Sequence, residues 1–175
     1  MSDYIPLRTP FSNMSKLTQE YVKSLFEYKD GVFVHKTAKA RGKCKVGDKV
    51  GNLTSDGYLR VMINYKEYRL HKIIFLWHHG YMPKNIDHIN HNLLDNSIEN
   101  LRESNSITNA YNRRLFKNNT SGCKNVSWNK KYNQWQIHIR ANKKTHCYYA
   151  KDFELAELIA HEARDLYHGR FACHV

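Results

Sequence analysis

Three short strand patterns followed by one long helical pattern occupy residues 124–168, and this order most constrains how the chain folds. The segments KNVSW, QWQIHIRA and KTHCYYAK are rich in β-branched and aromatic residues and are separated by the turn-forming stretches NKKYN and NKK. The segment DFELAELIAHEARDLY then has helical periodicity, with Asp152 as a good N-cap and Gly169 at its end. Three strands and one helix make a minimal two-layer domain.

Strand alternation divides the side chains of the middle strand between two faces. One face is polar and carries Gln134, Gln136, His138 and Arg140. The opposite face, which we expect to pack on the helix, carries Trp135, Ile137 and Ile139. The helix is expected to present one apolar face, made of Leu155, Leu158, Ile159, Ala163 and Leu166. Cys123 and Cys147 are predicted core positions of this small sheet.

The first hundred residues predict short helices and strands in alternation. The segment SKLTQEYVKSLFEY has a helical pattern that Thr18 caps, and VFVHK follows it as a short strand. Residues 58–65 alternate as a strand, with a turn near Lys66 and Glu67, and HKIIFLWHHG predicts a helix that Gly80 ends. The next thirty residues predict a strand, a loop with one helical turn, a strand remnant, and a helix capped by Ser104 or Asn105.

Positive charge is large and unevenly placed. The formal net charge is +12, and the stretch from Ser104 to Lys151 contains ten Lys and Arg residues but no Asp or Glu. Aromatic residues are interleaved with these cations, among them Trp128, Trp135 and Tyr149. A charge run is often only a solvated face, but this length and composition favour contact with nucleic acid.

The scattered cysteines and the lack of a long apolar run limit which classes of protein the chain can belong to. No C-x-x-C pair appears, which disfavours a zinc ribbon or a disulfide framework. The N-terminal stretch MSDYIPLRTPF lacks the apolar core of a signal peptide, and no segment approaches membrane-spanning length. We therefore expect a cytoplasmic protein with reduced thiols and no membrane partner.

The segment NIDHINHNLLDNSIENLRESNSITNAYNRR, residues 85–114, has the residue types that phosphodiester hydrolysis requires. Such a reaction needs a base to activate water and a divalent cation held by oxygen ligands. Asp87 and His88 are adjacent on a predicted extended segment, so their side chains point opposite ways and one can face the metal while the other faces the water. Asn109 can supply a second oxygen ligand, and the Asn100 amide can tie the loop between them.

With its spacing DHIN…DNSIENLR…N, this segment resembles the HNH endonucleases of the phage and intron-homing type. The upstream residues resemble phage members of that family, and residues 121–169 resemble the APETALA2-type DNA-binding domain. Together the two resemblances cover nearly all of the chain. They imply an α+β protein, in which a ββα-metal HNH nuclease core is followed by a small three-stranded antiparallel sheet packed on one helix.

The HNH resemblance implies a role for each residue of the motif. His88 is expected to be the general base, Asp87 and Asn109 are expected to bind one Mg²⁺ or Mn²⁺, and Asn100 is expected to brace the loop. Members of the family often have glycine where this chain has His91. This favours a tolerated turn variant, and the alternative is that His91 reaches the phosphate. His71 is expected to be structural rather than a phosphate ligand.

The APETALA2 resemblance implies that the sheet lies in the major groove of duplex DNA. The expected DNA contacts are Arg113, Arg114, Lys124, Ser127, Trp128, Lys130, Gln134, Gln136, His138, Arg140 and Lys144. We expect residues 1–115 to form the N-terminal region and nuclease core, 116–122 a linker, and 123–175 the DNA-binding domain.

The sequence therefore predicts a metal-dependent DNA endonuclease, of the phage homing type, that works in the host cytoplasm as a monomer or as a homodimer on DNA. A first alternative is a DNA-binding regulator with an inactive nuclease core. A second is a structural RNA-binding protein, although no segment resembles an RNA-stacking module.

Overall fold

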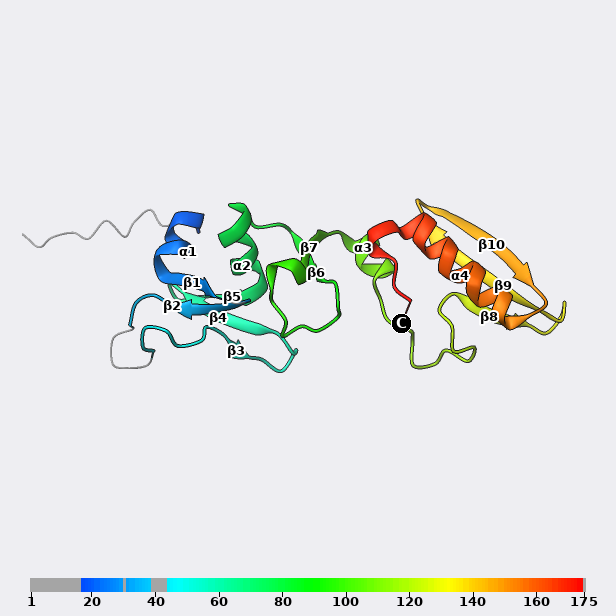
Figure 1. Ribbon diagram of the computed structural model, residues 1–175, viewed down its shortest axis with the longest axis horizontal. Coiled ribbons are helices and arrows are strands. Elements are labelled where there is room, and N and C mark those ends of the chain that lie inside the picture. Colours follow the sequence, from blue (N-terminus) through cyan, green and yellow to red (C-terminus); the bar gives the residue numbers. More distant parts are fainter. Residues whose placement is uncertain (1–16, 30, 39–43, 175) are drawn as a thin grey trace, which may run out of the picture. The chain divides into compact units, whose positions relative to one another are not determined.

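The computed structural model describes residues 17–29, 31–38 and 44–174, which form two compact units with their boundary between Arg102 and Glu103 (Figure 1). Each unit is described by itself. The N-terminal stretch MSDYIPLRTPF, on which the expectation about a signal peptide rests, lies outside the described residues.

The first unit is built from short helices and small antiparallel sheets. Strands β1 and β2 pair with each other, β4 pairs with both β3 and β5, and β6 pairs with β7. Its elements are α1 (Gln19–Leu25), β1 (Phe26–Lys29), β2 (Val32–His35), β3 (Asn52–Leu53), β4 (Leu59–Ile63), β5 (Lys66–Arg69), α2 (Leu70–His79), β6 (Asn85–His88), η3 (Ile98–Asn100) and β7 (Leu101–Ser104).

Helix α2 supplies much of the first core. Ile73 and Ile74 on α2 are fully buried together with Phe33 on β2. Thr18 caps α1 through its side chain, as expected, and Gly80 ends α2 in the left-handed conformation. These two helix ends could be read from local sequence because capping depends on one or two residues.

The turn between β4 and β5 lies two residues earlier than the sequence suggested. Asn64 and Tyr65 form it with φ values of 50° and 61°, and Ile63 pairs with Lys66 across it. A two-residue hairpin of this kind needs positive φ at both central positions, which asparagine tolerates well. Lys66 and Glu67, where the turn was expected, belong to β5.

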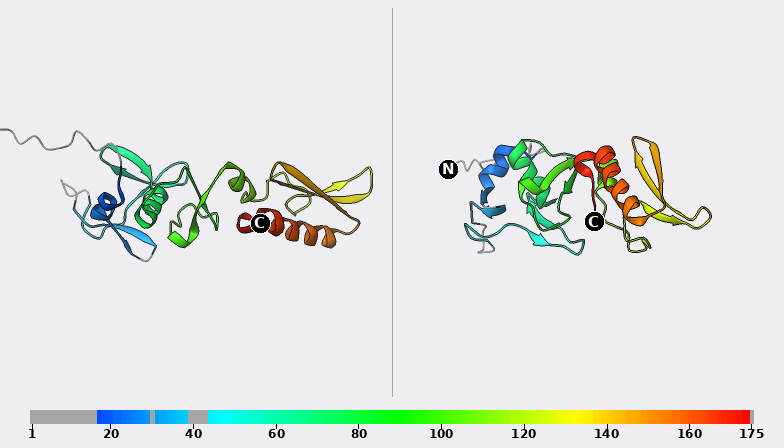
Figure 2. Two further views of the ribbon diagram at one scale, coloured as in Figure 1. Left: turned by 90° about the horizontal axis from the view of Figure 1, so that it is seen from above. Right: turned by 45° about the vertical axis from the view of Figure 1, so that its right-hand side comes forward.

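The second unit contains an antiparallel sheet of strand order β10-β9-β8 and a helix that packs on it (Figure 2). The strand patterns, the turns and the helix agree with the sequence prediction, including Asp152 as N-cap. Its elements are α3 (Ser106–Tyr111), β8 (Val126–Asn129), β9 (Gln134–Ala141), β10 (Lys144–Ala150), α4 (Phe153–His168) and η4 (Gly169–Phe171).

The buried face of α4 includes Ala163, as predicted, but otherwise differs from the predicted one. Ala156 and Ala160 are fully buried against Ile137 and Ile139, whereas the exposed fraction of Leu166 is 74%. Leu155 and Leu158 are also exposed, and Ile159 is only partly buried. The reason is steric: isoleucines fill the sheet face, so the helix that packs on it places small side chains at the contact.

Cys147 corrects a second prediction about this core. Cys123 is buried as expected, but Cys147 is exposed. It pairs in register with His138, and directly paired residues of an antiparallel sheet lie on one side of it. Its side is therefore the outer face, away from α4.

Helix α3 belongs to the second unit, although the sequence grouped residues up to 115 with the nuclease core. Its N-cap is Asn105, which forms a capping box with Thr108. At its end, the Tyr111 ring stacks on His168 with 3.9 Å between ring centroids.

Within the described part of the chain, no helix has the length and hydrophobicity that a bilayer span requires.

Candidate active site

Strand β6 places Asp87 and His88 at consecutive positions. His88 is buried with 4% exposure, and the side chain of Asp87 is largely buried. Neighbouring residues on a strand point to opposite faces, so the two side chains enter different surroundings, as the sequence predicted. Each is held by a side chain that lies further along the loop or on β7.

Asn96 holds the ring of His88. The distance between His88 Nε2 and Asn96 Oδ1 is 3.1 Å, and both side chains are buried. An amide oxygen only accepts hydrogen bonds, so Nε2 carries the proton in the neutral ring and Nδ1 carries the lone pair. This contact between Asn96 and His88 was not predicted from the sequence.

The His88 ring also lies against an aromatic wall. The His71 ring is 5.1 Å away, edge to face, and the Tyr58 ring is 6.1 Å away. Burial and, to a smaller extent, the charge on His88 lower the pKa of His71 to about 3. His71 is therefore uncharged at neutral pH.

Asn100 ties together the two ends of the loop that joins β6 to β7. Its Nδ2 donates to the Asp95 carbonyl oxygen at 2.7 Å, and its Oδ1 accepts from the Asn90 backbone N–H at 2.9 Å. The Ile89 N–H also donates to the Asn100 carbonyl at 2.9 Å. A buried amide that donates and accepts at once is suited to the bracing role that the resemblance implies.

Two other residues shape the same loop. His91 has a φ of 61°, so this turn does use the left-handed region that the family's glycine would adopt readily. Asp95 accepts from the hydroxyl of Ser97 at 2.6 Å and from Asn90 Nδ2 at 2.7 Å, and the Ser97 contact lowers the pKa of Asp95. Asp95 is thus a turn residue.

Arg102 on β7 holds the carboxylate of Asp87. Its Nη2 and Nε lie 2.7 Å and 2.9 Å from Asp87 Oδ2, and both side chains are largely buried. Two donors from one guanidinium fix the orientation of a carboxylate more firmly than one would. This pair was not foreseen, because the partner lies on a different strand.

Asn109 lies on α3, in the second unit, so the structure does not place it relative to Asp87 and His88. Its Oδ1 is a buried oxygen that has no hydrogen-bond partner among the described residues. A buried amide oxygen without a partner is costly unless a ligand satisfies it. Asn109 therefore has an oxygen suited to a cation.

The outer face of the second unit's sheet carries five of the eleven expected DNA contacts. Gln136 on β9 pairs with Ser127 on β8 and with Tyr149 on β10. Arg140 on β9 pairs with Thr145 on β10. These pairings place one polar set on the face opposite α4, namely Ser127, Gln134, Gln136, His138 and Arg140. Figure 1 shows that α4 runs along the three strands on the other side.

Lys124 and Trp128 differ from the other expected DNA contacts. Lys124 Nζ donates to the Tyr111 and Arg113 carbonyl oxygens, and its partial burial lowers the pKa of its ammonium. Trp128 pairs in register with Trp135 on the side of the sheet that α4 covers. Both residues therefore have structural contacts within the second unit, and Trp128 also keeps 40% of its surface exposed. The remaining cations of the expected set are exposed at loops or strand ends, namely Arg113, Arg114, Lys130 and Lys144.

Comparison with known proteins gives two matches to this chain. Residues 68–111 match the HNH endonuclease family, and this range includes Asp87, His88, Asn100 and Asn109. The chain is also 36% identical over 111 residues to Protein 3.8 of Escherichia phage T7, across 62% of this chain and 91% of that protein. No solved structure matches the chain.

Proposed function

Because the chain belongs to the family of Protein 3.8 of Escherichia phage T7 and carries an HNH endonuclease domain at residues 68–111, we propose that it is a metal-dependent DNA endonuclease. It would hydrolyse phosphodiester bonds in duplex DNA. The observation that best supports this proposal is that His88 is buried in the matched segment, beside a loop that Asn100 braces. In this proposal β6, β7 and α3 form the ββα-metal core.

His88 is the proposed general base. The Asn96 contact leaves the lone pair at Nδ1, so that nitrogen takes the proton from the attacking water. Neutral His71 beside the ring lets the imidazolium form without a neighbouring positive charge at that position. Asn100 acts indirectly, since its hydrogen bonds hold the loop from which the Asn96 side chain reaches His88.

The donor set fits a hard divalent cation. Asp87 offers a carboxylate oriented by Arg102, and Asn109 offers a buried amide oxygen without a partner among the described residues. Oxygen donors of this kind suit Mg²⁺ or Mn²⁺ better than softer metals. When bound, the metal would offset charge on the scissile phosphate and the leaving oxygen.

Substitution of Asn96 by aspartate tests the contact with His88. A carboxylate beside the ring favours its protonated form, so the acid limb of the pH–rate profile should move up by about 1–3 pH units. Cleavage at pH 7 should fall, and it should recover at higher pH. Asn96→Ala should slow cleavage without moving that limb. If Asn96→Asp lowers the rate equally at every pH, Asn96 has only a structural role.

The outer face of the β8–β10 sheet is the proposed DNA-reading surface, and residues 123–175 would supply much of the specific binding. Glutamine and arginine side chains can read adenine and guanine edges, whereas lysines mostly contact phosphates. The net charge of +12 supports this assignment. Gln136, His138 and Arg140 stand in one row along β9 and point away from α4.

Arg140 and Lys144 form a matched pair for testing that surface. Arg140→Ala should weaken binding to a preferred duplex by about 1–3 kcal/mol and should weaken binding to random duplex less. Lys144→Ala should weaken both equally and lower the salt slope of binding by about one. Salt-titrated binding to a selected site and to random DNA measures both effects. Equal losses on both duplexes for Arg140→Ala would assign it to a phosphate instead of a base.

A cleavage assay tests the whole proposal. Purified protein is incubated with supercoiled phage DNA and Mg²⁺, with an EDTA control. Nicked or linear DNA that appears only with metal supports the endonuclease, and binding without cleavage would favour the DNA-binding regulator. We further propose that the enzyme is of the homing type and acts in the host cytoplasm. One motif per chain predicts that a monomer nicks and that a homodimer cuts both strands.

A further inference from the structure

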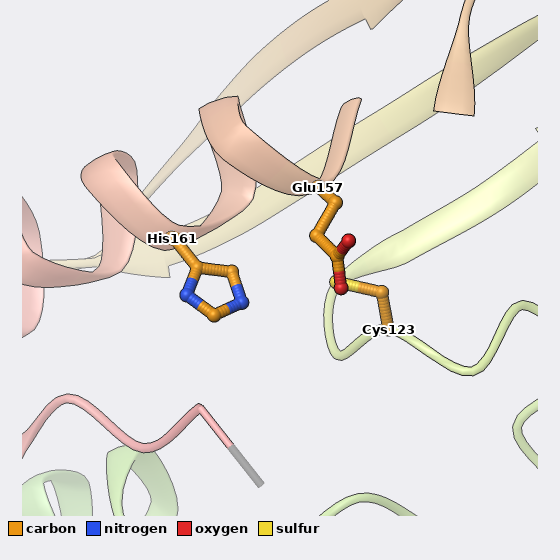
Figure 3. Close-up of side chains that lie close together, drawn as sticks. All are labelled: Cys123, Glu157 and His161. Atoms are coloured by element: carbon orange, nitrogen blue, oxygen red, sulfur yellow. The ribbon is translucent and has the colours of Figure 1, made fainter. Parts of the chain in front are cut away.

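A second cluster of metal-binding side chains lies in the C-terminal unit, away from the HNH segment in sequence. Cys123 comes from the loop before β8, and Glu157 and His161 come from α4 (Figure 3). One ligand atom from each lies within 4.8 Å of the others. From this geometry we propose that Cys123, Glu157 and His161 bind one zinc ion.

The helix spacing explains two of the three positions. Residues four apart on an α-helix lie on one face, and Figure 3 shows Glu157 and His161 on the same side of α4. The His161 ring is also stacked on His174, with ring centroids 4.5 Å apart. Cys123 is buried and therefore already fixed. An ion would bind the loop before β8 to the helix.

The donor chemistry favours zinc over magnesium. Zinc accepts thiolate, imidazole and carboxylate ligands together, whereas magnesium requires oxygen ligands. Bond lengths of about 2.0–2.3 Å would bring the ligand atoms to roughly 3.5 Å from one another, so the side chains must close by about an ångström. Glu157 is exposed and His161 is half-buried, so both have room to do so. Three protein ligands leave a fourth position for water.

The charges also balance. A zinc ion with one thiolate and one carboxylate has no net charge, so the buried Arg164 nearby does not oppose it. Burial raises the pKa of the Cys123 thiol, and Arg164 partly counters that shift. Burial lowers the pKa of His161, which favours its neutral, ligating form. Zinc must therefore displace the thiol proton, and affinity should rise about tenfold per pH unit below the thiol pKa.

The experiment uses the full chain after chelator treatment and titrates it with Co²⁺, a spectroscopic substitute for zinc. We expect one equivalent of cobalt to give a thiolate-to-cobalt charge-transfer band, and one equivalent of zinc to remove it. The candidate HNH site includes no cysteine, so this band reports the second site even if the chain does not cut DNA. Atomic emission should give one zinc per chain.

Variants decide which residues bind. Glu157→Gln alters an exposed side chain and should weaken zinc binding by more than the roughly 10–100-fold that loss of an outer partner costs, with the circular dichroism unchanged. Cys123→Ser should abolish the band, and Cys147→Ser, which removes the exposed thiol, should keep it. A wild-type chain without the band, or a Glu157→Gln variant with wild-type zinc affinity, overturns the proposal.

Discussion

The variant His88→Ala is expected to cut DNA about 10²–10⁴-fold more slowly than the wild type, because it lacks the general base. Its affinity for duplex DNA should stay nearly unchanged, since phosphate contacts dominate affinity and the proposed reading face is on β8–β10. Single-turnover cleavage and equilibrium binding at one salt concentration measure the two quantities.

A matched control and a contrary outcome make this test sharp. His79→Ala removes an exposed histidine from the end of α2 and should cut at the wild-type rate. Since His88 is buried, circular dichroism must show that the variant is folded. If folded His88→Ala cuts as fast as the wild type, another group is the base.

The variant Asp87→Asn is expected to lose cleavage by roughly a thousandfold, because metal polarisation of the phosphate contributes several kcal/mol to catalysis. Asparagine keeps an oxygen that can accept a hydrogen bond from Arg102, although the guanidinium loses its counter-charge. Asn109→Ala should show a similar loss. High Mn²⁺ should restore part of the activity in both variants.

Metal titration separates a lost ligand from a damaged fold. The concentration of Mg²⁺ that gives half-maximal cleavage should rise in Asp87→Asn, and circular dichroism should show that the variant is folded. Glu99→Gln changes an exposed carboxylate at η3 and serves as the control. An Asp87→Asn variant with the wild-type metal requirement would remove Asp87 from the proposed ligand set.

The elements of the second unit could be predicted because their signals are local. Alternation along 134–141 and the turn at Asn142 and Lys143 define a hairpin without knowledge of the rest of the chain. The buried face of α4 could not be predicted in this way. Because leucine is more hydrophobic than alanine, the sequence pattern predicts that the leucines are buried. The close contact with Ile137 and Ile139 instead leaves room only for the small side chains of Ala156 and Ala160.

The candidate site also combines local features that the sequence predicted with longer-range contacts that it did not predict. The Asp87 and His88 pair and the loop that Asn100 braces lie within one short motif, so their placement followed from spacing. Asn96 is 8 residues from His88, and Arg102 is 15 residues from Asp87. Those contacts depend on how the loop closes and how β6 pairs with β7, which residue spacing alone does not determine.

The exposed thiol of Cys147 gives the proposed reading face a chemical weakness. Of the four cysteines, Cys123 and Cys173 are buried and Cys44 is half-buried. Cys147 on β10 is exposed and pairs with His138 on β9. Oxidation in air would join two copies through the surface that is proposed to lie against DNA. Such a covalent pair would fail in a gel-shift assay although each copy is fully folded. Recovery of binding after treatment with a thiol reductant would then identify storage damage, and it would report from which side of the sheet the DNA is held.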